Sequence, residues 1–182
     1  MTGIILAGGE NRRMGTDKAF LVVAGKPLIE HVLAVHREIF DATIVVTRTP
    51  ERYKSYSVVL AEDAIDLRGP LTGIYTGLLR SSDDYHFVSA CDMPFLNARL
   101  ISHLAAQTDG HDAVVPMVNG MPEPLHAIYH RRLLPVIEGC LKSGEQKVQR
   151  MFAHARVRYV PDEVIERFDP DKRSFKNVNT PQ

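Results

Sequence analysis

Residues 3–18 read GIILAGGENRRMGTDK and join a short apolar run to a glycine-rich, cationic loop. The run at residues 3–6 has the length and composition of a buried strand. The loop at residues 6–18 holds three glycines, two arginines and a lysine. Glycines let backbone N–H groups approach a polyphosphate closely, and arginine and lysine add cationic donors. The stretch therefore predicts a strand that leads into a phosphate-binding loop; the alternative is a solvated glycine turn.

The loop differs from two common nucleotide-binding motifs. It matches neither G-x-G-x-x-G nor G-x-x-x-x-G-K-[ST], so it is not a dinucleotide fingerprint or a Walker A loop. The chain also lacks a G-x-S-x-G elbow, an H-E-x-x-H pair and the protein-kinase signatures. Dehydrogenase, hydrolase and metalloprotease interpretations therefore lose their usual support.

The rest of the chain alternates short β-branched runs with amphipathic stretches. We expect strands at residues 3–6, 20–23, 43–47, 58–60, 85–90, 113–118, 125–129, 156–160 and 175–178, with an Asn119-Gly120 turn joining the sixth to the seventh. We expect helices at residues 27–40, 71–80, 131–141, 146–153 and 162–168, and one from the N-cap Asn97 to about residue 107. Gly73 and Gly77 weaken the helix that contains them. The alternation predicts an α/β, doubly wound, mostly parallel sheet.

Polar side chains follow the buried strands, where ligands bind in such sheets. Thr47 and Arg48 end the second long strand, and they could meet either a ligand or solvent. Asp63 follows the third; its carboxylate could accept from guanine N–H groups or ribose hydroxyls, or cap a turn. Asp92 follows the fourth, and a single carboxylate facing a phosphate loop suits Mg²⁺. A helix-capping role for Asp92 is weaker, because Asn97 already marks the helix start.

The histidines give weaker signals. His126 and His130 would point to one side of a strand, but no third ligand is evident, so a zinc site is not favoured. His31 and His36 lie in a helical stretch, where we expect them at the surface.

Two asparagines near the end of the chain, Asn177 and Asn179, would point the same way in extended backbone. Their amides suit a neutral heterocycle or a secondary metal contact; a terminal turn is the alternative. Cys91 and Cys140 are too few for a disulfide framework, and Cys91 reads as a packed small hydrophobe.

Length and charge limit the remaining possibilities. The chain has 182 residues, and 22 Lys and Arg balance 22 Asp and Glu. This length predicts a single domain over residues 1–182. Zero net charge argues against broad nucleic-acid or anionic-membrane binding. The apolar run near the N-terminus is too short for a signal peptide or a membrane span, so we expect a cytoplasmic protein.

Five blocks, taken in order, resemble the molybdenum cofactor guanylyltransferases: LAGGENRRMGTDK at 6–18, RGPLTGI at 68–74, CDMPF at 91–95, EPLHAIY at 123–129 and NVNTP at 177–181. The LAGG and CDMP forms resemble the guanylyl branch, since cytidylyl relatives usually read LAAG. The resemblance implies a Rossmann-like nucleotidyltransferase fold. It also implies transfer of GMP from GTP to the terminal phosphate of molybdopterin, with or without molybdenum, and release of pyrophosphate.

The same resemblance implies roles for particular residues. Leu6, Ala7, Gly8 and Gly9 would contact the guanine nucleotide, with Thr47 standing where relatives often have Asn. By the same resemblance, Asp63 of this chain would recognise guanine or ribose. The catalytic set would be Arg13 and Lys18, on the phosphates, and Asp92, holding Mg²⁺. Asn177 and Asn179 match positions tied to the pterin side or the metal.

Several alternatives stay open. A related nucleotidyltransferase could use CTP or make a nucleotide-sugar. A non-catalytic GTP-binding regulator could keep the loop without turnover. Such a regulator would not need all three of Arg13, Lys18 and Asp92, which this chain has. A dehydrogenase is more distant. The predicted partners are GTP and molybdopterin, with molybdopterin-transfer proteins and molybdoenzyme chaperones as further candidates.

Overall fold

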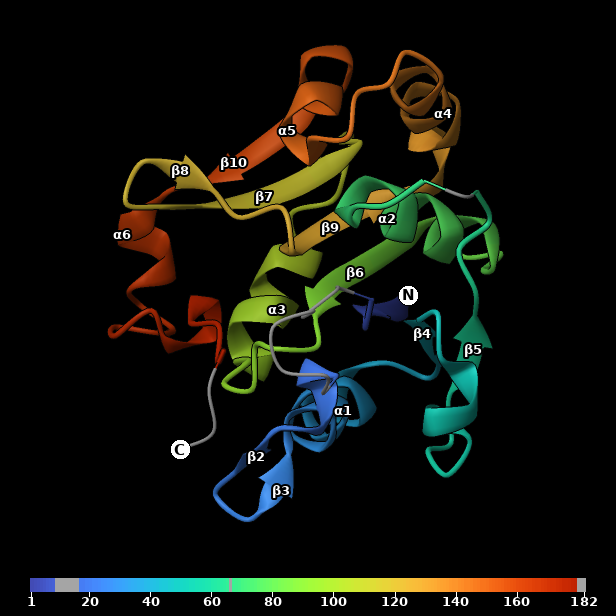
Figure 1. Ribbon diagram of the computed structural model, residues 1–182. Coiled ribbons are helices and arrows are strands. Elements are labelled where there is room, and N and C mark those ends of the chain that lie inside the picture. The colour runs from blue at the N-terminus through green and yellow to red at the C-terminus, as the bar shows by residue number, and fades with distance from the viewer. Residues whose placement is uncertain (9–16, 66, 180–182) are drawn as a thin grey trace.

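A twisted sheet with helices on both faces organises the chain (Figure 1). The computed structural model describes residues 1–8, 17–65 and 67–179. The strand order is β10-β7-β9-β6-β1-β4-β5, with β8 paired to β7 outside this path. The strands are β1 (Thr2–Leu6), β4 (Thr43–Val46), β5 (Val59–Ala61), β6 (Tyr85–Ala90), β7 (Ala113–Val118), β8 (Met121–Pro122), β9 (His126–His130) and β10 (Val157–Val160).

The sheet is mixed but mostly parallel, as predicted. Strands β5, β4, β1 and β6 pair in parallel, and so do β7 and β10. Strand β9 lies between β6 and β7 and is antiparallel to both. The carboxyl ends of the parallel strands therefore share one rim with the amino end of β9.

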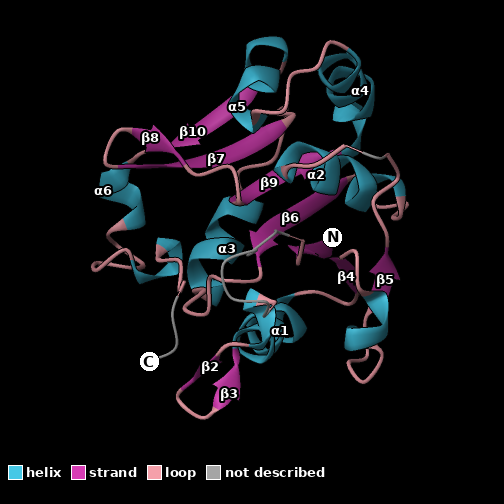
Figure 2. Cartoon of the chain, in the orientation of Figure 1, coloured by secondary structure: helices cyan, strands magenta, loops and turns pink. Residues whose placement is uncertain are grey.

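Six α-helices and a small hairpin complete the described part of the fold (Figure 2). Helices α1 (Leu28–Ile39) and α3 (Ala98–Ala105) cover one face of the sheet; α2 (Pro70–Leu79) and α4 (Leu134–Lys142) cover the other. The shorter helices are α5 (Val148–Met151) and α6 (Asp162–Ile165), and β2 (Val22–Val23) pairs with β3 (Lys26–Pro27). Each face of the sheet buries its own apolar cluster, and β1 contributes to both.

Most predicted elements are found within one or two residues of their expected bounds, and the predicted N-cap is present. Asn97 caps α3, because its Oδ1 accepts from the Leu100 N–H at 3.0 Å. Three expectations were wrong in detail. Residue 20 belongs to a 3₁₀ turn, Lys18–Phe20, and the Asn119-Gly120 turn leads into β8 rather than β9. Residues 175–178 form no strand, for a reason given with the site below.

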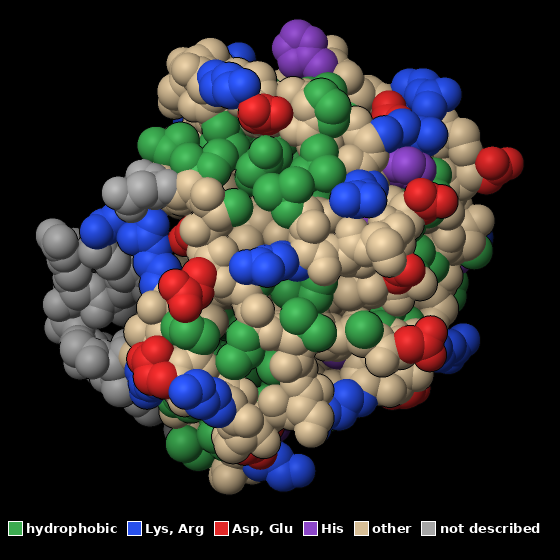
Figure 3. Space-filling view, turned by 90° about the vertical axis from the view of Figure 1, so that its right-hand side faces the viewer, with side chains coloured by type: hydrophobic (Ala, Val, Ile, Leu, Met, Phe, Trp, Pro, Cys, Tyr) green, Lys and Arg blue, Asp and Glu red, His purple; other side chains and the backbone are tan. Residues whose placement is uncertain are grey.

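The charged side chains are mixed on the face beside β5. Figure 3 shows Lys and Arg interspersed with Asp and Glu there, without a broad field of one sign. In the described ranges, no helix combines the length and the apolar character that a membrane crossing needs.

The two glycines of α2 allow the helix to lie close to β1. A Cβ on Gly77 would lie 2.7 Å from two side-chain carbons of Ile4, and one on Gly73 would lie 3.0 Å from Leu6 Cδ2. The glycines that weaken helix propensity are therefore required by the contact between helix and sheet.

We expect Gly77→Ala to destabilise the fold. Overpacking costs about 1–3 kcal/mol, against a gain of at most about 1 kcal/mol in helix propensity. Gly139→Ala in α4 is the matched control, because a Cβ there meets nothing within 4 Å. Denaturant unfolding should show a lower midpoint for the first variant and an equal or higher one for the second; the same shift in both would contradict the packing argument.

His36 is fully buried, which corrects its expected surface position. Its Nε2 lies 2.9 Å from Ser89 Oγ, and its ring packs beside that of Phe87, between α1 and the sheet. His126, on β9, is equally buried and packs between Phe87 and Phe175. Burial lowers the pKa of His36 and of His126 to about 3, since a charged imidazole would lose its hydration.

We expect the protein to lose stability as the pH falls below about 6.5. Below that pH, the two histidines bind protons in the unfolded chain but stay neutral in the folded protein. This difference lowers the free energy of unfolding by about 2 kcal/mol per histidine at pH 5. Urea unfolding at pH 7 and pH 5 measures the difference. His126→Phe should remove one histidine's share of it, whereas exposed His154→Gln should leave it intact. Equal stability of the wild type at both pH values would contradict this assignment.

Candidate active site

A cleft of about 790 Å³ opens along the rim where the parallel strands end. It is bounded by the ends of β1, β4, β5 and β6, by the start of α2 and by the residues that lead from β8 into β9. Eight of the predicted site residues line it: Leu6, Ala7, Gly8, Lys18, Thr47, Asp63, Asp92 and Asn177. Gly9 and Arg13 lie outside the described residues. The cleft volume lies in the upper part of the range for small-molecule sites.

Asp92 lies at the carboxyl end of β6, next to the first loop. The Cys91 N–H donates to the Leu6 carbonyl at 3.1 Å, which continues the pairing of β6 with β1 past the last strand residue. The carboxylate Oδ2 of Asp92 lies 3.5 Å from Lys18 Nζ. The side chains of Asp92 and Lys18 are 14% and 28% exposed, so the pair is screened from water but open to the cleft.

Asp17 fixes the backbone from which Lys18 extends. Its Oδ1 accepts from the Ala19 N–H at 3.1 Å and caps the short 3₁₀ turn. Its Oδ2 accepts from the Tyr53 hydroxyl at 3.1 Å and lies 3.6 Å from Arg52 NH1. The lysine is thereby tied to the segment that follows β4.

The C-terminal segment closes one side of the cleft through Asp92 and Lys18. The Val178 N–H donates to the backbone carbonyl of Asp92 at 2.8 Å, and the Val178 side chain packs against Leu21 and Leu28. Lys18 Nζ donates to Asn179 Oδ1 at 2.5 Å. The segment thus bonds to one loop carbonyl instead of a strand ladder, which is why the predicted edge strand is absent.

The opposite end of the cleft holds the second predicted carboxylate. Asp63 Oδ2 accepts from Arg48 Nε at 3.0 Å, so one carboxylate oxygen is already engaged. Thr47 is 1% exposed, and its Oγ1 accepts from the Thr49 N–H at 3.2 Å. Thr47 therefore shapes the turn after β4, while Arg48 and Asp63 present their charges to the cleft.

The metal expectation can be tested against the donors at the rim. Residues 1–8, 17–65 and 67–179 contain no group of three or more His, Cys, Asp or Glu side chains that could hold an ion. Mg²⁺ commonly takes only one or two carboxylates and completes its shell with substrate phosphates and waters. Asp92, on the wall of the cleft, fits that pattern.

The sequence interpretation missed the part of the cleft formed before β9. Because β9 is antiparallel, its amino end lies at the same rim as the carboxyl end of β6, and residues 121–125 line the cleft. Glu123 is the charged member of that segment, and Gln149 of α5 also lines the cleft. The block EPLHAIY was the one signal that could have pointed there.

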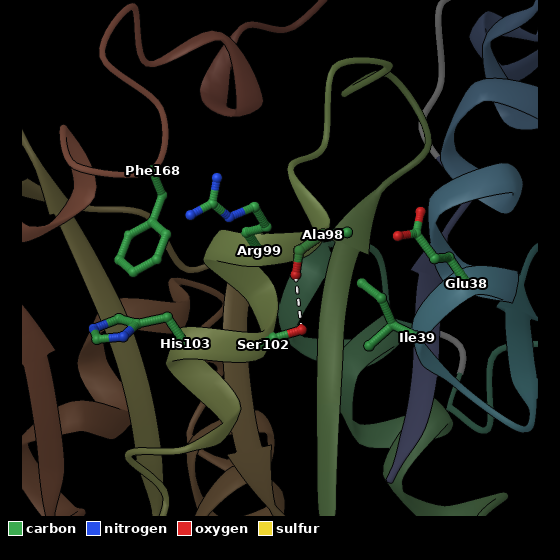
Figure 4. A pocket seen from close by; sticks show the side chains of 7 residues that line it. All are labelled: Glu38, Ile39, Ala98, Arg99, Ser102, His103 and Phe168. Carbon is green, nitrogen blue, oxygen red and sulfur yellow. Dashed lines mark hydrogen bonds between the residues drawn. The ribbon is translucent and has the colours of Figure 1, made fainter.

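A second hollow, of about 600 Å³, lies away from this rim, between α1 and α3 (Figure 4). Glu38 and Ile39 line one side, and Arg99, His103 and Phe168 the other. None of the predicted site residues that the structure describes borders it, whereas eight of them line the larger cleft.

A lysine and a carboxylate gathered at the ends of parallel strands are an arrangement that enzymes acting on nucleoside triphosphates use. Residues 3–160 match the family model described as the MobA-like NTP transferase domain. The chain belongs to this family.

Named relatives are similar to this chain over nearly its full length. The chain is 41% identical to the molybdenum cofactor guanylyltransferase of Desulfosudis oleivorans, covering 99% of this chain and 90% of that one. It is 36% identical to the one from Syntrophotalea carbinolica, covering 98% and 86%. The crystal structure of molybdopterin-guanine dinucleotide biosynthesis protein A from Archaeoglobus fulgidus superposes with a TM-score of 0.85 at 31% identity, covering 100% of this chain and 93% of that one.

Proposed function

We propose that this chain transfers GMP from GTP to the terminal phosphate of molybdopterin, giving the guanine dinucleotide and pyrophosphate. Full-length similarity to guanylyltransferases supports the reaction. The observation that carries it in the structure is the Lys18–Asp92 pair, 3.5 Å apart on the wall of a cleft of about 790 Å³. The acceptor phosphate is already ionised near neutral pH, so the reaction needs charge neutralisation and alignment more than a base.

The nucleotide occupies the β1–β4–β5 side in this proposal. The backbone of Leu6, Ala7 and Gly8 lies against the base and sugar; Gly9, outside the described residues, stays a predicted contact of the same nucleotide. Asp63 accepts from guanine or ribose donors through the oxygen that Arg48 leaves free. Thr47 contributes by holding the turn, because its hydroxyl is engaged by Thr49.

The phosphates lie over the start of the 3₁₀ turn. Lys18 supplies one cation there, and Arg13 supplies a second from the loop that lies outside the described residues. Both offset charge that builds on the departing pyrophosphate, and cationic donors are most effective when they are fixed before the reaction. The contacts of Asp17 with Tyr53 and with the Ala19 N–H provide that fixation for Lys18.

Asp92 is the residue that would hold Mg²⁺. A bound magnesium ion would act as a Lewis acid on the phosphoryl oxygens. Asp92 itself keeps a negative charge beside Lys18, and its backbone carbonyl holds Val178 in place. Asn177, on the cleft wall, and Asn179, on Lys18, form the acceptor side together with that segment.

The decisive experiment incubates the protein with GTP, Mg²⁺ and molybdate-loaded or metal-free molybdopterin. The proposal expects the guanine dinucleotide by mass and one pyrophosphate per product. Parallel thermal unfolding with GTP, CTP or UTP and Mg²⁺ tests base choice, since a ligand stabilises only the state that binds it. Stabilisation by CTP in place of GTP would favour a cytidylyltransferase, and GTP binding without pyrophosphate release would favour a regulator. Protein partners that deliver molybdopterin or receive the product stay predictions.

A further inference from the structure

Two carboxylates flank Asp92 along the rim of the sheet. In the strand order β9-β6-β1-β4-β5, Asp92 ends β6, Asp63 follows β5, and Glu123 precedes β9. At about 4.8 Å per strand, the rim from β9 to β5 spans about 19 Å, with β6 one step from β9 and three steps from β5. Asp63 and Glu123 thus lie on opposite sides of the proposed reaction centre.

Glu123 is held rigidly by its backbone. Its N–H donates to the Pro116 carbonyl at 2.9 Å, and its carbonyl accepts from the His126 N–H at 3.2 Å. The peptide groups on both sides of its Cα are therefore bonded to β7 and β9. The side chain lies on the wall of the cleft.

The carboxylate of Glu123 has no hydrogen-bond donor or cation among the residues described in the structure. It is half-buried, and burial raises the pKa of the Glu123 carboxyl. A half-buried carboxylate that has no N–H partner of its own gains stability when a ligand supplies one. Asp63 differs, because Arg48 already neutralises it.

The surroundings of Glu123 are apolar. Met121 on β8 is 63% exposed although it borders the cleft, and Pro122, Pro124 and Leu125 complete the same wall. Exposed methionine is an adaptable surface that packs well against aromatic rings. A flat heterocycle with N–H donors on one edge matches this wall.

We propose that Glu123 is a specificity-determining residue for the acceptor, whose pyrimidinone ring N–H and exocyclic amino group donate to its carboxylate. This inference rests on the proposed function, which supplies a pterin as the acceptor. Met121, next to Glu123 on the cleft wall, lies against the face of the heterocycle.

Guanine carries the same pair of donors, so the position along the rim decides the assignment. The nucleotide must reach from its base to the phosphates at Lys18, and the β1–β5 side of Asp92 provides three strand steps for that reach. The β9 side provides one step, and the C-terminal segment with Asn177 borders the same cleft. Each heterocycle is therefore recognised by its own carboxylate. Asp63 binds the base of the nucleotide, and Glu123 binds the ring of the acceptor.

The test compares Glu123→Gln with the wild type and with Glu38→Gln, a matched change at an exposed glutamate of α1 outside the cleft. Glutamine keeps the shape but turns one acceptor into a donor that faces a ligand donor. We expect the acceptor KM of Glu123→Gln to rise about 10- to 100-fold, which corresponds to one charge-assisted hydrogen bond. The affinity for GTP and Mg²⁺ should stay within about twofold, and Glu38→Gln should match the wild type. An unfolding midpoint equal to or above that of the wild type shows that Glu123→Gln is folded.

Two results would overturn the assignment: an unchanged acceptor KM, or a loss confined to GTP affinity, which would place guanine at Glu123. A wild type that makes no dinucleotide contradicts the proposed function instead. In that case pterin fluorescence decides the inference by direct binding. The wild type should then bind 6-hydroxymethylpterin more tightly than the lumazine that has oxygen in place of the amino group, and Glu123→Gln should lose this preference. Equal binding of both compounds to the wild type would refute it.

Discussion

We expect turnover to fall by about 1000-fold or more when Asp92 is replaced by asparagine. Asparagine preserves the shape of the side chain and leaves the backbone carbonyl that accepts from Val178, so the fold at the rim is retained. What disappears is the negative charge that would hold Mg²⁺ beside Lys18. A Lewis-acid contribution of several kcal/mol is lost with it, and about 4 kcal/mol corresponds to about 1000-fold in rate.

Pyrophosphate release at saturating GTP, followed over a range of Mg²⁺ concentrations, measures this effect. The apparent requirement for Mg²⁺ should rise at the same time. Asp162→Asn is the matched control, because Asp162 also pairs with a lysine, Lys172 Nζ at 2.5 Å, but lies outside the cleft. Near-normal turnover of Asp92→Asn at low Mg²⁺ would remove Asp92 from the metal site.

The sequence was most informative where elements are regular and buried on both sides. The strands at residues 85–90 and 113–118 were predicted with the bounds that the structure has, because both runs are largely apolar and are bounded by polar and turn residues. The site residues that follow parallel strands could also be placed, since those strands end at one rim. Thr47, Asp63 and Asp92 line the cleft for that reason.

The local sequence pattern could not predict that β9 runs antiparallel to its neighbours. A run of alternating apolar residues has the same appearance in a parallel and in an antiparallel strand, and only pairing with β6 and β7 reveals which it is. Glu123 was therefore read as a residue before a strand, without the consequence that it reaches the cleft. His36 was placed at the surface because periodicity counts histidine as polar, whereas Ser89 and Phe87 offer it a buried position.

The predicted edge strand at residues 175–178 was wrong because tertiary contacts determine this segment. Apolar residues at 175 and 178 suggested an edge strand, yet Val178 is buried by side chains of the β2–β3 hairpin region and bonded to a single carbonyl, that of Asp92. Tertiary contacts between residues more than eighty positions apart determine this segment. The same contacts bring Asn179 to Lys18, which the spacing of the two asparagines alone did not predict.

Lys18→Met should lower turnover by about 100-fold and weaken GTP binding. Methionine keeps most of the length of the side chain but removes the cation that lies on Asp92 and Asn179. A charge-assisted hydrogen bond made mainly in the transition state accounts for about 10- to 150-fold in rate. Separate measurement of kcat and of the KM for GTP shows how the loss divides, and Lys172→Met, outside the cleft, should leave both unchanged. Unaltered kinetics of Lys18→Met would exclude Lys18 from the phosphate site.

The double variant Lys18→Met/Asp92→Asn tests whether the two side chains act as one unit. Independent effects would multiply to about 100,000-fold, the product of the two single losses. Because Nζ and Oδ2 lie 3.5 Å apart and serve the same charge-neutralising step, we expect the double variant to fall within about tenfold of Asp92→Asn alone. Once the carboxylate is gone, Lys18 keeps Asn179 but loses the charged partner that holds it at the reaction centre, so its removal costs little more. A fully multiplicative loss would instead mean that Lys18 and Asp92 contribute to separate steps.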